Sequence, residues 1–463
     1  MQDPTRHTTV LRRAFSRLRQ TLRDQRGVSA VAFAISFAVL APMALGIFDV
    51  YTQTEQRGKL QDALDAAALY AARSPANTTA DVDAIGDKAL TANLQLIHGA
   101  SLRSSDFTLV GNKVVAQASV QLAAFAPMEF AHTPVTVNSE VTRSGNNLEV
   151  ALVLDTTGSM AGTRITNLKS AANQLIDLVV SDTQTPFYSK IAIVPYSNSV
   201  NPGAYTPTVR GIAASGTDST PLPGKANIKF TPQGGGTQKT YAVSNCVSER
   251  IGTQAFTDAP ASAGINPVGW DYPNTNENTC IAQTVQPLTS DKTALHTEIG
   301  TLTAANSTAG HIGLAWGWYM VSPNWASLFP TASKPAAYGT DHLLKVVILM
   351  TDGAFNTAYC KGVIAGNSGS GSGSTSNHIN CNSPNGDAFA QAQALCTNMK
   401  AAPNNIIVYT VGFDVSTDPA ATSLLSNCAT DSKHVYFPAD DGVSLQVAFQ
   451  SIAADLNRLR ISH

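Results

Sequence analysis

The chain has 463 residues, too many for one ordinary domain, and only 13% of them are charged, about half the usual share. The formal net charge at pH 7 is −2, which argues against a broad surface for nucleic acid. The basic residues are concentrated at the N-terminus, where seven arginines fall within residues 1–27. We therefore expect two or three domains behind a short cationic tail, and no nucleic acid among the partners.

An uncharged, apolar stretch covers residues 28–48, directly after the basic tail. About 20 apolar residues are enough to cross the hydrocarbon core of a membrane, and Pro42 is tolerated in such a helix. Because the arginines flank one side only, the positive-inside rule predicts a transmembrane helix with residues 1–27 in the cytoplasm and the rest exported. A signal peptide cleaved near "ALG" (44–46) is the alternative.

Residues 49–146 are predicted to form a helical stalk and a small α+β region. The run 51–73 lacks proline and has apolar residues at helical spacing, so the membrane helix should continue through it, and a second helix should cover roughly 80–97. Residues 106–142 alternate and are rich in Val and Thr, which predicts a small sheet. The segment "RSGNN" (143–147) is expected to be a linker.

Apolar runs and helical patterns alternate over residues 147–463. The runs predict strands buried on both faces at 148–154, 190–196, 343–350 and 405–411. Helices are predicted at 163–181, 289–302, 309–321, 387–401 and 442–459. This alternation predicts an α/β domain with a doubly wound, mostly parallel sheet, whose ligand site lies at the carboxyl ends of the strands.

Two segments interrupt this alternation. Residues 198–288 are rich in Pro, Gly, Thr and Asn, and we expect a large insertion with short strands of its own. Residues 365–376, "AGNSGSGSGSTS", are typical of a flexible loop. The alternation of strands and helices should resume after each of them.

Six cysteines, all beyond residue 240, agree with export. An even number in an exported region predicts disulfides, and the spacings do not match those of zinc sites. Six cysteines allow fifteen pairings. Among these we favour the pairing of neighbours in sequence, which gives Cys246–Cys280, Cys360–Cys381 and Cys396–Cys428.

Carboxylates and hydroxyls follow two of the predicted strands. Asp155 ends the first strand, and the D-x-T-x-S spacing brings Thr157 and Ser159 round the next turn. Asp352 follows the strand 343–350, and Thr308 directly precedes a predicted helix. Because the carboxyl ends of parallel strands meet at one edge of a sheet, we expect these side chains to converge. Such a set of hard oxygen ligands suits Mg²⁺, or else Mn²⁺ or Ca²⁺, and leaves a coordination position for an acidic side chain of a partner.

These residues resemble the metal-ion-dependent adhesion site (MIDAS) of von Willebrand factor type A domains. "DTTGSM", Thr308 and "TDG" match the family's D-x-S-x-S motif, Thr and Asp. The resemblance implies a metal-ligand role for Asp155, Thr157, Ser159, Thr308 and Asp352. Thr157 stands where the family usually has Ser; it keeps a hydroxyl and adds a methyl, so we expect metal binding to survive.

The N-terminal segment resembles the TadE/TadG-type segment of Flp (Tad) pilus assembly proteins. The resemblance rests on "RGVSAVAFAISFAVLAPMALGIFDV" followed by "LQDALDAAALYAA". Such an anchoring segment joined to a von Willebrand A domain is the arrangement of TadG-type proteins. It covers 26–73 and the α/β framework after 148, but not 198–288. Processed pilin-like relatives carry a Glu at the fifth position after the glycine, whereas Ala32 follows Gly27 here, so we expect a permanent anchor.

The resemblance implies a function in protein–protein adhesion. We expect a single-pass inner-membrane protein whose bulk is periplasmic and which binds pilus or secretion-system components through a metal ion. We do not expect an enzyme. The alternative is a cell-envelope adhesin, or a structural or sensor protein outside pilus biogenesis, in which a metal only stabilises the fold.

The same residues allow simpler interpretations. Asp155 and Thr157 could cap a helix or a turn, and "TDG" could be an ordinary turn. Ser159, His311 and Asp352 are the residue types of a hydrolytic triad, but "TGSMAG" lacks the G-x-S-x-G spacing of a nucleophilic serine. We expect His311 to be a surface or packing residue.

Overall fold

The protein is described here by a computed structural model with two compact units, Met1–Arg143 and Ser144–His463. The structure describes residues 25–74, 76, 78–94, 100–111, 113–122, 134–143, 145–185, 187–210, 217–218, 227–261, 278–416 and 418–461. Most of the predicted basic tail (1–27), and the last residues of the helix predicted at 80–97, lie outside these ranges. Each unit has its own hydrophobic core.

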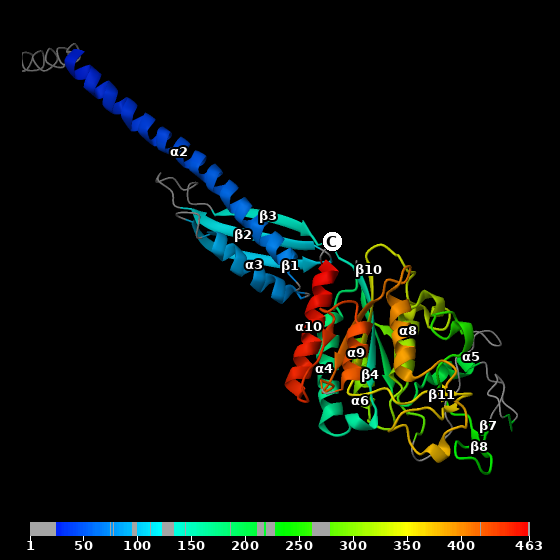
Figure 1. Ribbon diagram of the computed structural model, residues 1–463. Helices are drawn as coiled ribbons and strands as arrows, with labels where there is room; N and C mark the ends of the chain where they lie inside the picture. Colours follow the sequence, from blue (N-terminus) through cyan, green and yellow to red (C-terminus); the bar gives the residue numbers. More distant parts are fainter. Residues whose placement is uncertain are drawn as a thin grey trace, which may run out of the picture. The chain divides into compact units, whose positions relative to one another are not determined.

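The first unit begins with one long helix, α2 (Gln25–Ala72), which runs unbroken through Pro42 (Figure 1). Its part from Ser29 onward is long and apolar enough to cross a membrane, and the most apolar stretch is not buried against protein. The predicted apolar stretch and stalk are therefore one continuous helix. Its length and composition are compatible with a single-pass membrane anchor, although a signal sequence has the same properties.

The C-terminal half of α2 packs on a small sheet and a second helix. Leu60, Leu64, Ala67 and Ala71, whose spacing predicted one helical face, are all buried. They meet α3 (Thr79–Leu94) and an antiparallel sheet of β1 (Ala100–Val110), β2 (Lys113–Leu122) and β3 (Val135–Thr142). Strand β1 begins six residues before the predicted start at 106 because its first residues, "ASLRSS", are mostly polar and exposed and so lack an apolar alternation.

The second unit is built on a six-stranded mixed sheet with the order β14-β13-β10-β4-β5-β9. Its strands are β4 (Asn147–Asp155), β5 (Ser189–Tyr196), β9 (Gln286–Thr289), β10 (Leu343–Thr351), β13 (Ile407–Gly412) and β14 (Val435–Tyr436). All neighbours are parallel except β5 and β9, which are antiparallel. The central strands β4 and β10 are buried on both faces, which explains their continuous apolar sequences.

Helices cover both faces of this sheet, so alternate residues of each strand enter different cores (Figure 1). Leu152 and Leu154 pack with α4 (Thr163–Val179), α6 (Lys292–Thr301) and α10 (Gly442–Ile461). Ala151 and Val153 face α7 (Gly310–Val321), α8 (Ala388–Lys400) and α9 (Pro419–Cys428). The five predicted helices are present, whereas α9 was not predicted. Its segment begins with Asp-Pro, a typical turn signal, and its only large apolar residues are the adjacent Leu424 and Leu425.

The predicted insertion 198–288 differs from expectation at its end, where Gln286–Thr289 forms the edge strand β9 of the main sheet. A short strand with a proline fits an edge position, and its sequence offers no alternation to detect. Elsewhere the insertion contains α5 (Thr206–Arg210) and a sheet of β6 (Thr217–Asp218), β7 (Asn227–Phe230) and β8 (Lys239–Ala242).

The Gly/Ser segment 365–376, predicted as a flexible loop, is largely exposed and is tied to its surroundings by hydrogen bonds. The Gly369 amide donates to the Asn356 carbonyl at 2.8 Å, and Ser372 is 1% exposed. A short hairpin of β11 (Tyr359–Cys360) and β12 (Val363–Ile364) precedes it. Residues without large side chains allow this close backbone packing, which composition alone does not reveal.

The three disulfides join Cys246–Cys280, Cys360–Cys381 and Cys396–Cys428, so the predicted pairing of neighbours is confirmed. The second closes the base of the Gly/Ser segment, and the third joins α8 to α9. Two of the three bridges therefore hold elements that the hydrophobic pattern predicts poorly.

Helix α7 lies unusually close to the sheet because glycines form its inner face. A Cβ at Gly317 would lie 2.4 Å from Cγ2 of Val153, and one at Gly313 would lie 2.6 Å from the ring of Tyr196. Real side chains do not tolerate such distances, so glycine is required here despite its low helix propensity.

Gly313→Ala is expected to destabilise the second unit by about 1–3 kcal/mol, because overpacking against Tyr196 outweighs the gain of about 1 kcal/mol in helix propensity. Urea unfolding of the full chain in detergent measures this. The control is Gly300→Ala in α6, where no atom lies within 4 Å of the added Cβ. It should leave stability unchanged or slightly raised, and an equal loss in both variants would contradict the packing argument.

Candidate metal centre

Four of the five predicted ligands meet at the carboxyl ends of β4 and β10. Asp155 is the last residue of β4, and Asp352 directly follows β10, its parallel neighbour. The Thr157 and Ser159 hydroxyls lie 2.9 Å apart, and the Ser159 hydroxyl donates to Oδ1 of Asp352 at 2.7 Å. The Thr157 amide donates to Oδ1 of Asp155 at 2.9 Å, which fixes the turn that carries both hydroxyls.

Asp155 is completely buried and has no ion-pair partner among the described residues. Its Oδ2 accepts hydrogen bonds from the Thr351 hydroxyl at 2.8 Å and the Tyr196 hydroxyl at 3.1 Å. Burial raises the pKa of Asp155, and the hydrogen bonds oppose this only in part. The carboxylate is therefore well oriented but electrostatically uncompensated.

Asp352 carries the second carboxylate of the centre. Burial and the negative charge of Asp155 raise the pKa of Asp352 to about 7, against the hydrogen bonds from Ser159 and Arg164. Nη1 of Arg164 lies 3.2 Å from Oδ2 of Asp352. Because two carboxylates crowd one buried place, an added cation would stabilise their ionised forms.

Arg164 also joins two further acidic residues that the sequence analysis did not single out. Its Nη2 lies 2.7 Å from Asp414 and 2.8 Å from Asp440, which belong to the loops after β13 and β14. No motif marks these residues. Tyr196, by contrast, ends strand β5, so the same strand-end reasoning that selected Asp155 could have found it.

Thr308 lies in the loop next to this network without joining it. The Gly158 amide donates to the Asn306 carbonyl at 2.9 Å, which brings the two loops together. The Thr308 amide donates to Oδ1 of Asn356 at 3.0 Å. Within the described part of the chain, the Thr308 hydroxyl makes no hydrogen bond to the other four predicted ligands.

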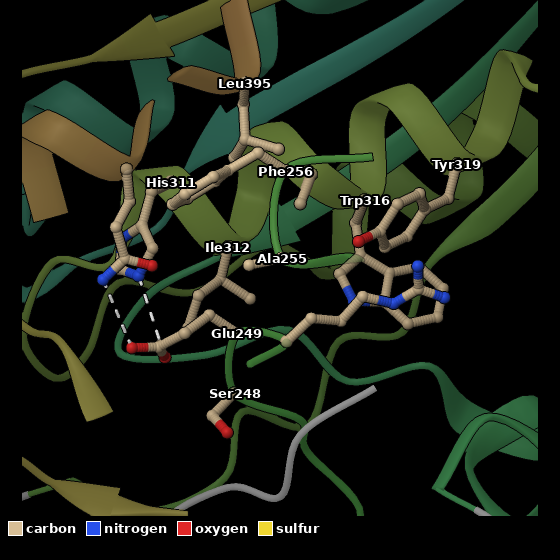
Figure 2. A pocket seen from close by; sticks show the side chains of 12 residues that line it. Ser248, Glu249, Ala255, Phe256, His311, Ile312, Trp316, Tyr319 and Leu395 are labelled. Carbon is tan, nitrogen blue, oxygen red and sulfur yellow. Dashed lines mark hydrogen bonds and ion pairs between the residues drawn. The ribbon is translucent and has the colours of Figure 1, made fainter. Parts of the chain in front are cut away.

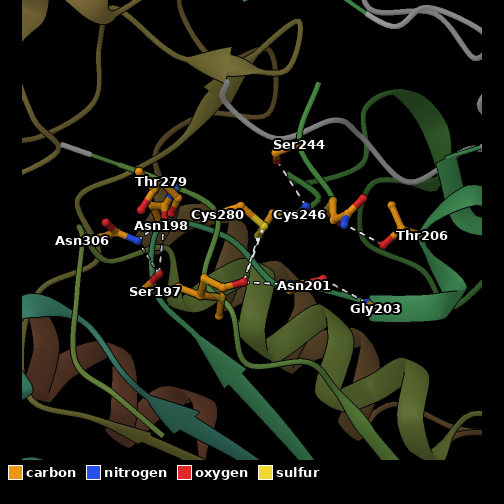
Figure 3. Close-up of a disulfide and its surroundings, with 12 residues drawn as sticks. Ser197, Asn198, Asn201, Gly203, Thr206, Ser244, Cys246, Thr279, Cys280 and Asn306 are labelled. Atoms are coloured by element: carbon orange, nitrogen blue, oxygen red, sulfur yellow. Dashed lines mark hydrogen bonds between the residues drawn. A yellow bond between two sulfur atoms is a disulfide. The ribbon is translucent and has the colours of Figure 1, made fainter. Parts of the chain in front are cut away.

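Residues of the insertion hold the Thr308 loop in place beside the Cys246–Cys280 disulfide (Figure 3). The Asn306 side chain donates to the Thr279 carbonyl at 2.7 Å, and the Ser307 hydroxyl donates to Oδ1 of Asn278 at 2.6 Å. The disulfide fixes Cys280, the neighbour of Thr279, to the segment after β8. The insertion therefore supports one side of the centre.

The residue types of a hydrolytic triad are not assembled into one. The Ser159 hydroxyl bonds to Asp352 and Thr157, while neither ring nitrogen of His311 has a hydrogen-bond partner among the described residues. The nearest acidic oxygen to His311 is that of Glu249, at 3.8 Å. A serine nucleophile would need a base within hydrogen-bond reach.

The donor set fits a hard divalent cation. In the described ranges no group of three or more His, Cys, Asp or Glu side chains could hold a metal, so any ion here would depend on hydroxyls as well as carboxylates. Oxygen-only ligands with few carboxylates favour Mg²⁺, Mn²⁺ or Ca²⁺ over zinc.

Residues 27–74 match the family described as putative Flp pilus-assembly TadE/G-like. Among solved structures, the chain is similar to the vWF domain of the type V pili tip protein Mfa5 from Porphyromonas gingivalis, with 12% identity and a TM-score of 0.40 over 69% of this chain and 97% of that one. It is also similar to the PilB minor pilin from Streptococcus sanguinis, with 11% identity and a TM-score of 0.34 over 78% of this chain and 79% of that one. A third similar structure is the pilus adhesin RrgA from Streptococcus pneumoniae, with 12% identity and a TM-score of 0.34 over 75% of this chain and 48% of that one. No curated protein matches the chain.

Proposed function

We propose that this protein is a membrane-anchored, metal-dependent protein-binding component of Flp/Tad-type pilus assembly. The observation that carries the proposal is the hydrogen-bonded convergence of Asp155, Thr157, Ser159 and Asp352 at the carboxyl ends of β4 and β10. The TadE/G-like match of residues 27–74 supports the pilus context. In this proposal the chain recognises a partner and performs no covalent chemistry.

The second unit is, in this proposal, a von Willebrand A-type domain with a doubly wound sheet. The support comes from its parallel central strands, the helices on both faces and the carboxylates at the carboxyl edge. Asp155, Thr157, Ser159, Thr308 and Asp352 would hold Mg²⁺, with Mn²⁺ and Ca²⁺ as alternatives. When bound, the ion supplies a positive position for one oxygen of the partner's acidic side chain.

The chain's own residues prepare this position. Tyr196 and Thr351 orient the Asp155 carboxylate, while Arg164 holds one oxygen of Asp352. The Ser159 hydroxyl donates to the other oxygen of Asp352 and lies 2.9 Å from the Thr157 hydroxyl. Because these groups are hydrogen-bonded, little reorganisation is needed before an ion binds.

The anchor would place the site in the periplasm. The arginines of residues 1–27 favour a cytoplasmic N-terminus, and α2 is long enough to leave the membrane as a stalk. Three disulfides in the second unit suit an oxidising compartment. The partner would then be a pilus or secretion-system component of the inner membrane or periplasm that presents an acidic side chain.

A purely structural metal is the second candidate, within pilus assembly or in another cell-envelope protein. It is favoured by the burial of Asp155 and by the raised pKa of Asp352, since an ion that relieves their repulsion would stabilise the fold. Asp155→Ala separates the candidates. Cross-linking in intact cells, followed by purification with and without chelator, compares this variant with wild type.

For recognition, we expect a defined envelope protein to co-purify with wild type only without chelator and never with Asp155→Ala, while the variant still folds in the membrane. If the partner stays bound to the variant and only its melting temperature falls, the metal is structural. If the partner binds equally with and without chelator, the metal-dependent proposal is wrong.

The apparent metal affinity is expected to fall about tenfold between pH 8 and pH 6. The pKa of Asp352 is about 7, and metal binding requires its proton to leave. In the metal-free protein, folded Asp352 keeps its proton up to about pH 7, whereas in the unfolded chain it loses the proton above about pH 4. The contribution of Asp352 to the free energy of unfolding therefore falls as pH rises from about 4 towards 7. Mn²⁺ titration by calorimetry at pH 6, 7 and 8 measures the effect. An affinity that is flat over this range would contradict it.

A further inference from the structure

A small cavity lies beside α7, on the face of the second unit that holds α8 (Figure 2). The space open to the centre of a water-sized sphere is about 10 Å³, which suits one water molecule or one monatomic ion. Its lining includes Glu249 and Arg250 from the insertion and His311, Trp316 and Tyr319 from α7. The predicted adhesion site uses none of these residues.

Arg250 is the unusual member of this lining. Its side chain is 2% exposed, and its Nε and both Nη atoms have no hydrogen-bond partner among the described residues. No described carboxylate lies within ion-pair distance of it. The guanidinium instead lies 5.3 Å from the ring centroids of both Tyr319 and Trp325.

Aromatic rings compensate this charge only in part. Stacking on rings offsets part of the cost of desolvation, but it leaves the guanidinium hydrogens without acceptors. Arginine keeps its proton inside proteins, so it cannot escape the penalty by becoming neutral. Leaving a buried charge unpaired strongly destabilises a fold. The structure therefore requires an acceptor beside Arg250, and a negatively charged one is favoured.

Trp316 supplies a second donor at the same cavity. Its indole Nε1 is buried and, like Arg250, has no hydrogen-bond partner in the described part of the chain. An indole N–H can only donate. The Glu249 carboxylate and the His311 ring face each other at 3.8 Å, and in Figure 2 they lie away from Trp316 and Tyr319. The cavity thus has a donor-only end, at Arg250 and Trp316, where an anion would not meet the Glu249 charge.

We infer that this cavity binds one monatomic anion, a halide such as chloride, between the Arg250 guanidinium and the Trp316 indole N–H. A water molecule would satisfy the hydrogen bonds but would bring no charge to Arg250. The buried carboxylates of Asp258 and Glu249 are near but beyond ion-pair distance of Arg250, so they offset its charge only in part. Because the centre of a water-sized sphere has only about 10 Å³ in which to move, a single-atom anion suits the cavity better than a larger, polyatomic one. The bound halide would stabilise α7, the helix that follows Thr308, independently of any ion at the predicted adhesion site.

The test is the melting temperature of the full chain in detergent, in chelator, across a series of sodium chloride and bromide concentrations balanced with sodium gluconate to constant ionic strength. We expect a saturable binding curve with a rise of about 2–4 °C for each tenfold increase in halide above half-saturation. Trp316→Phe removes one donor and keeps an aromatic ring, so it should raise the half-saturating concentration up to about tenfold. Arg250→Met should abolish the response.

The matched control is Trp318→Phe, because the Trp318 N–H already donates to the Tyr338 hydroxyl at 2.9 Å and does not line the cavity. It should leave the half-saturating concentration unchanged. Crystals grown in bromide should show an anomalous peak beside the Arg250 guanidinium. The inference is overturned if chloride and gluconate act alike, if Trp316→Phe and Trp318→Phe respond equally, or if a water or a carboxylate of the chain occupies the position. Arg250→Met can fail to fold without affecting this outcome.

Discussion

Asp155→Asn is expected to weaken Mn²⁺ binding at least about hundredfold while leaving the metal-free fold as stable as wild type, or more stable. The variant loses one of only two charged ligands in a set otherwise made of hydroxyls. Losing a residue that merely supports a metal ligand lowers metal affinity by up to about hundredfold, and losing a charged ligand should cost more. The Asn amide has the shape of the carboxylate, and its oxygen still accepts the hydrogen bond from the Thr157 amide. Its NH₂ group replaces Oδ2, so the Tyr196 and Thr351 hydroxyls must donate to the Met350 and Gly353 carbonyls, which lie 3.1 and 3.2 Å from them. Isothermal titration calorimetry with Mn²⁺ at pH 8 measures the affinity.

The stability part of this prediction follows from the burial of Asp155. Burial without a counter-ion among the described residues raises the pKa of Asp155, which means that the fold disfavours its charged form. A neutral amide avoids this cost, so the variant should gain about 1–3 kcal/mol in chelator. Urea unfolding with and without Mg²⁺ measures this difference. Wild type should be stabilised by Mg²⁺, and the variant should not respond.

The control for both measurements is Asp341→Asn, an exposed carboxylate on the loop before β10. It should change neither the Mn²⁺ affinity nor the response to Mg²⁺. If Asp155→Asn binds Mn²⁺ as tightly as this control does, Asp155 is not a ligand. If Asp155→Asn is less stable than wild type in chelator, the hydrogen bonds that the Asp155 carboxylate accepts stabilise the fold by more than its burial costs.

Glu149→Gln is expected to destabilise the second unit by about 3–5 kcal/mol, the largest stability effect that we predict for a single substitution. Glu149 on β4 and Lys345 on β10 are register partners and are 0% and 5% exposed. Nζ of Lys345 lies 2.5 Å from Oε2 of Glu149. Burial already lowers the pKa of Lys345, and the Glu149 charge opposes this shift, so its removal leaves an uncompensated buried cation.

The Gln side chain keeps the other contacts of this position. Oε1 of Glu149 accepts from the Tyr188 hydroxyl and the Ala336 amide, both at 2.9 Å, and the Gln carbonyl can accept both. The double variant Glu149→Gln/Lys345→Met removes the stranded cation and should recover most of the loss. Urea unfolding of the two variants and wild type measures the difference.

Because this pair lies at the amino ends of the strands, Mn²⁺ affinity should be unchanged in whatever fraction of Glu149→Gln remains folded. A loss below about 1 kcal/mol would mean that the pair is solvated, as exposed pairs are. A double variant no more stable than Glu149→Gln would show that the loss comes from packing and not from the unpaired charge.

Local patterns determined most of the second unit. The apolar runs of β4 and β10 are typical of strands buried on both faces, and helical spacing defined α4, α7, α8 and α10 within a few residues. The strand-end rule then brought Asp155, Thr157, Ser159 and Asp352 to one edge, because each belongs to a strand terminus that the sequence marks. Whether a metal binds there stays a prediction.

Tertiary structure alone decided the surroundings of these residues. Strands β9 and β14 are too short to carry a pattern, so only pairing with a long neighbour defines them, and helix α9 is defined by its packing on β13 and α8. Arg164 meets Asp352, Asp414 and Asp440 across up to 276 residues of sequence, and no local signal records such a contact. The burial of Arg250 is equally invisible in its own segment, because it depends on Tyr319 and Trp325, which are distant in sequence. Spacing along the chain encodes which face a residue occupies, whereas its charge environment depends on segments that only folding brings together.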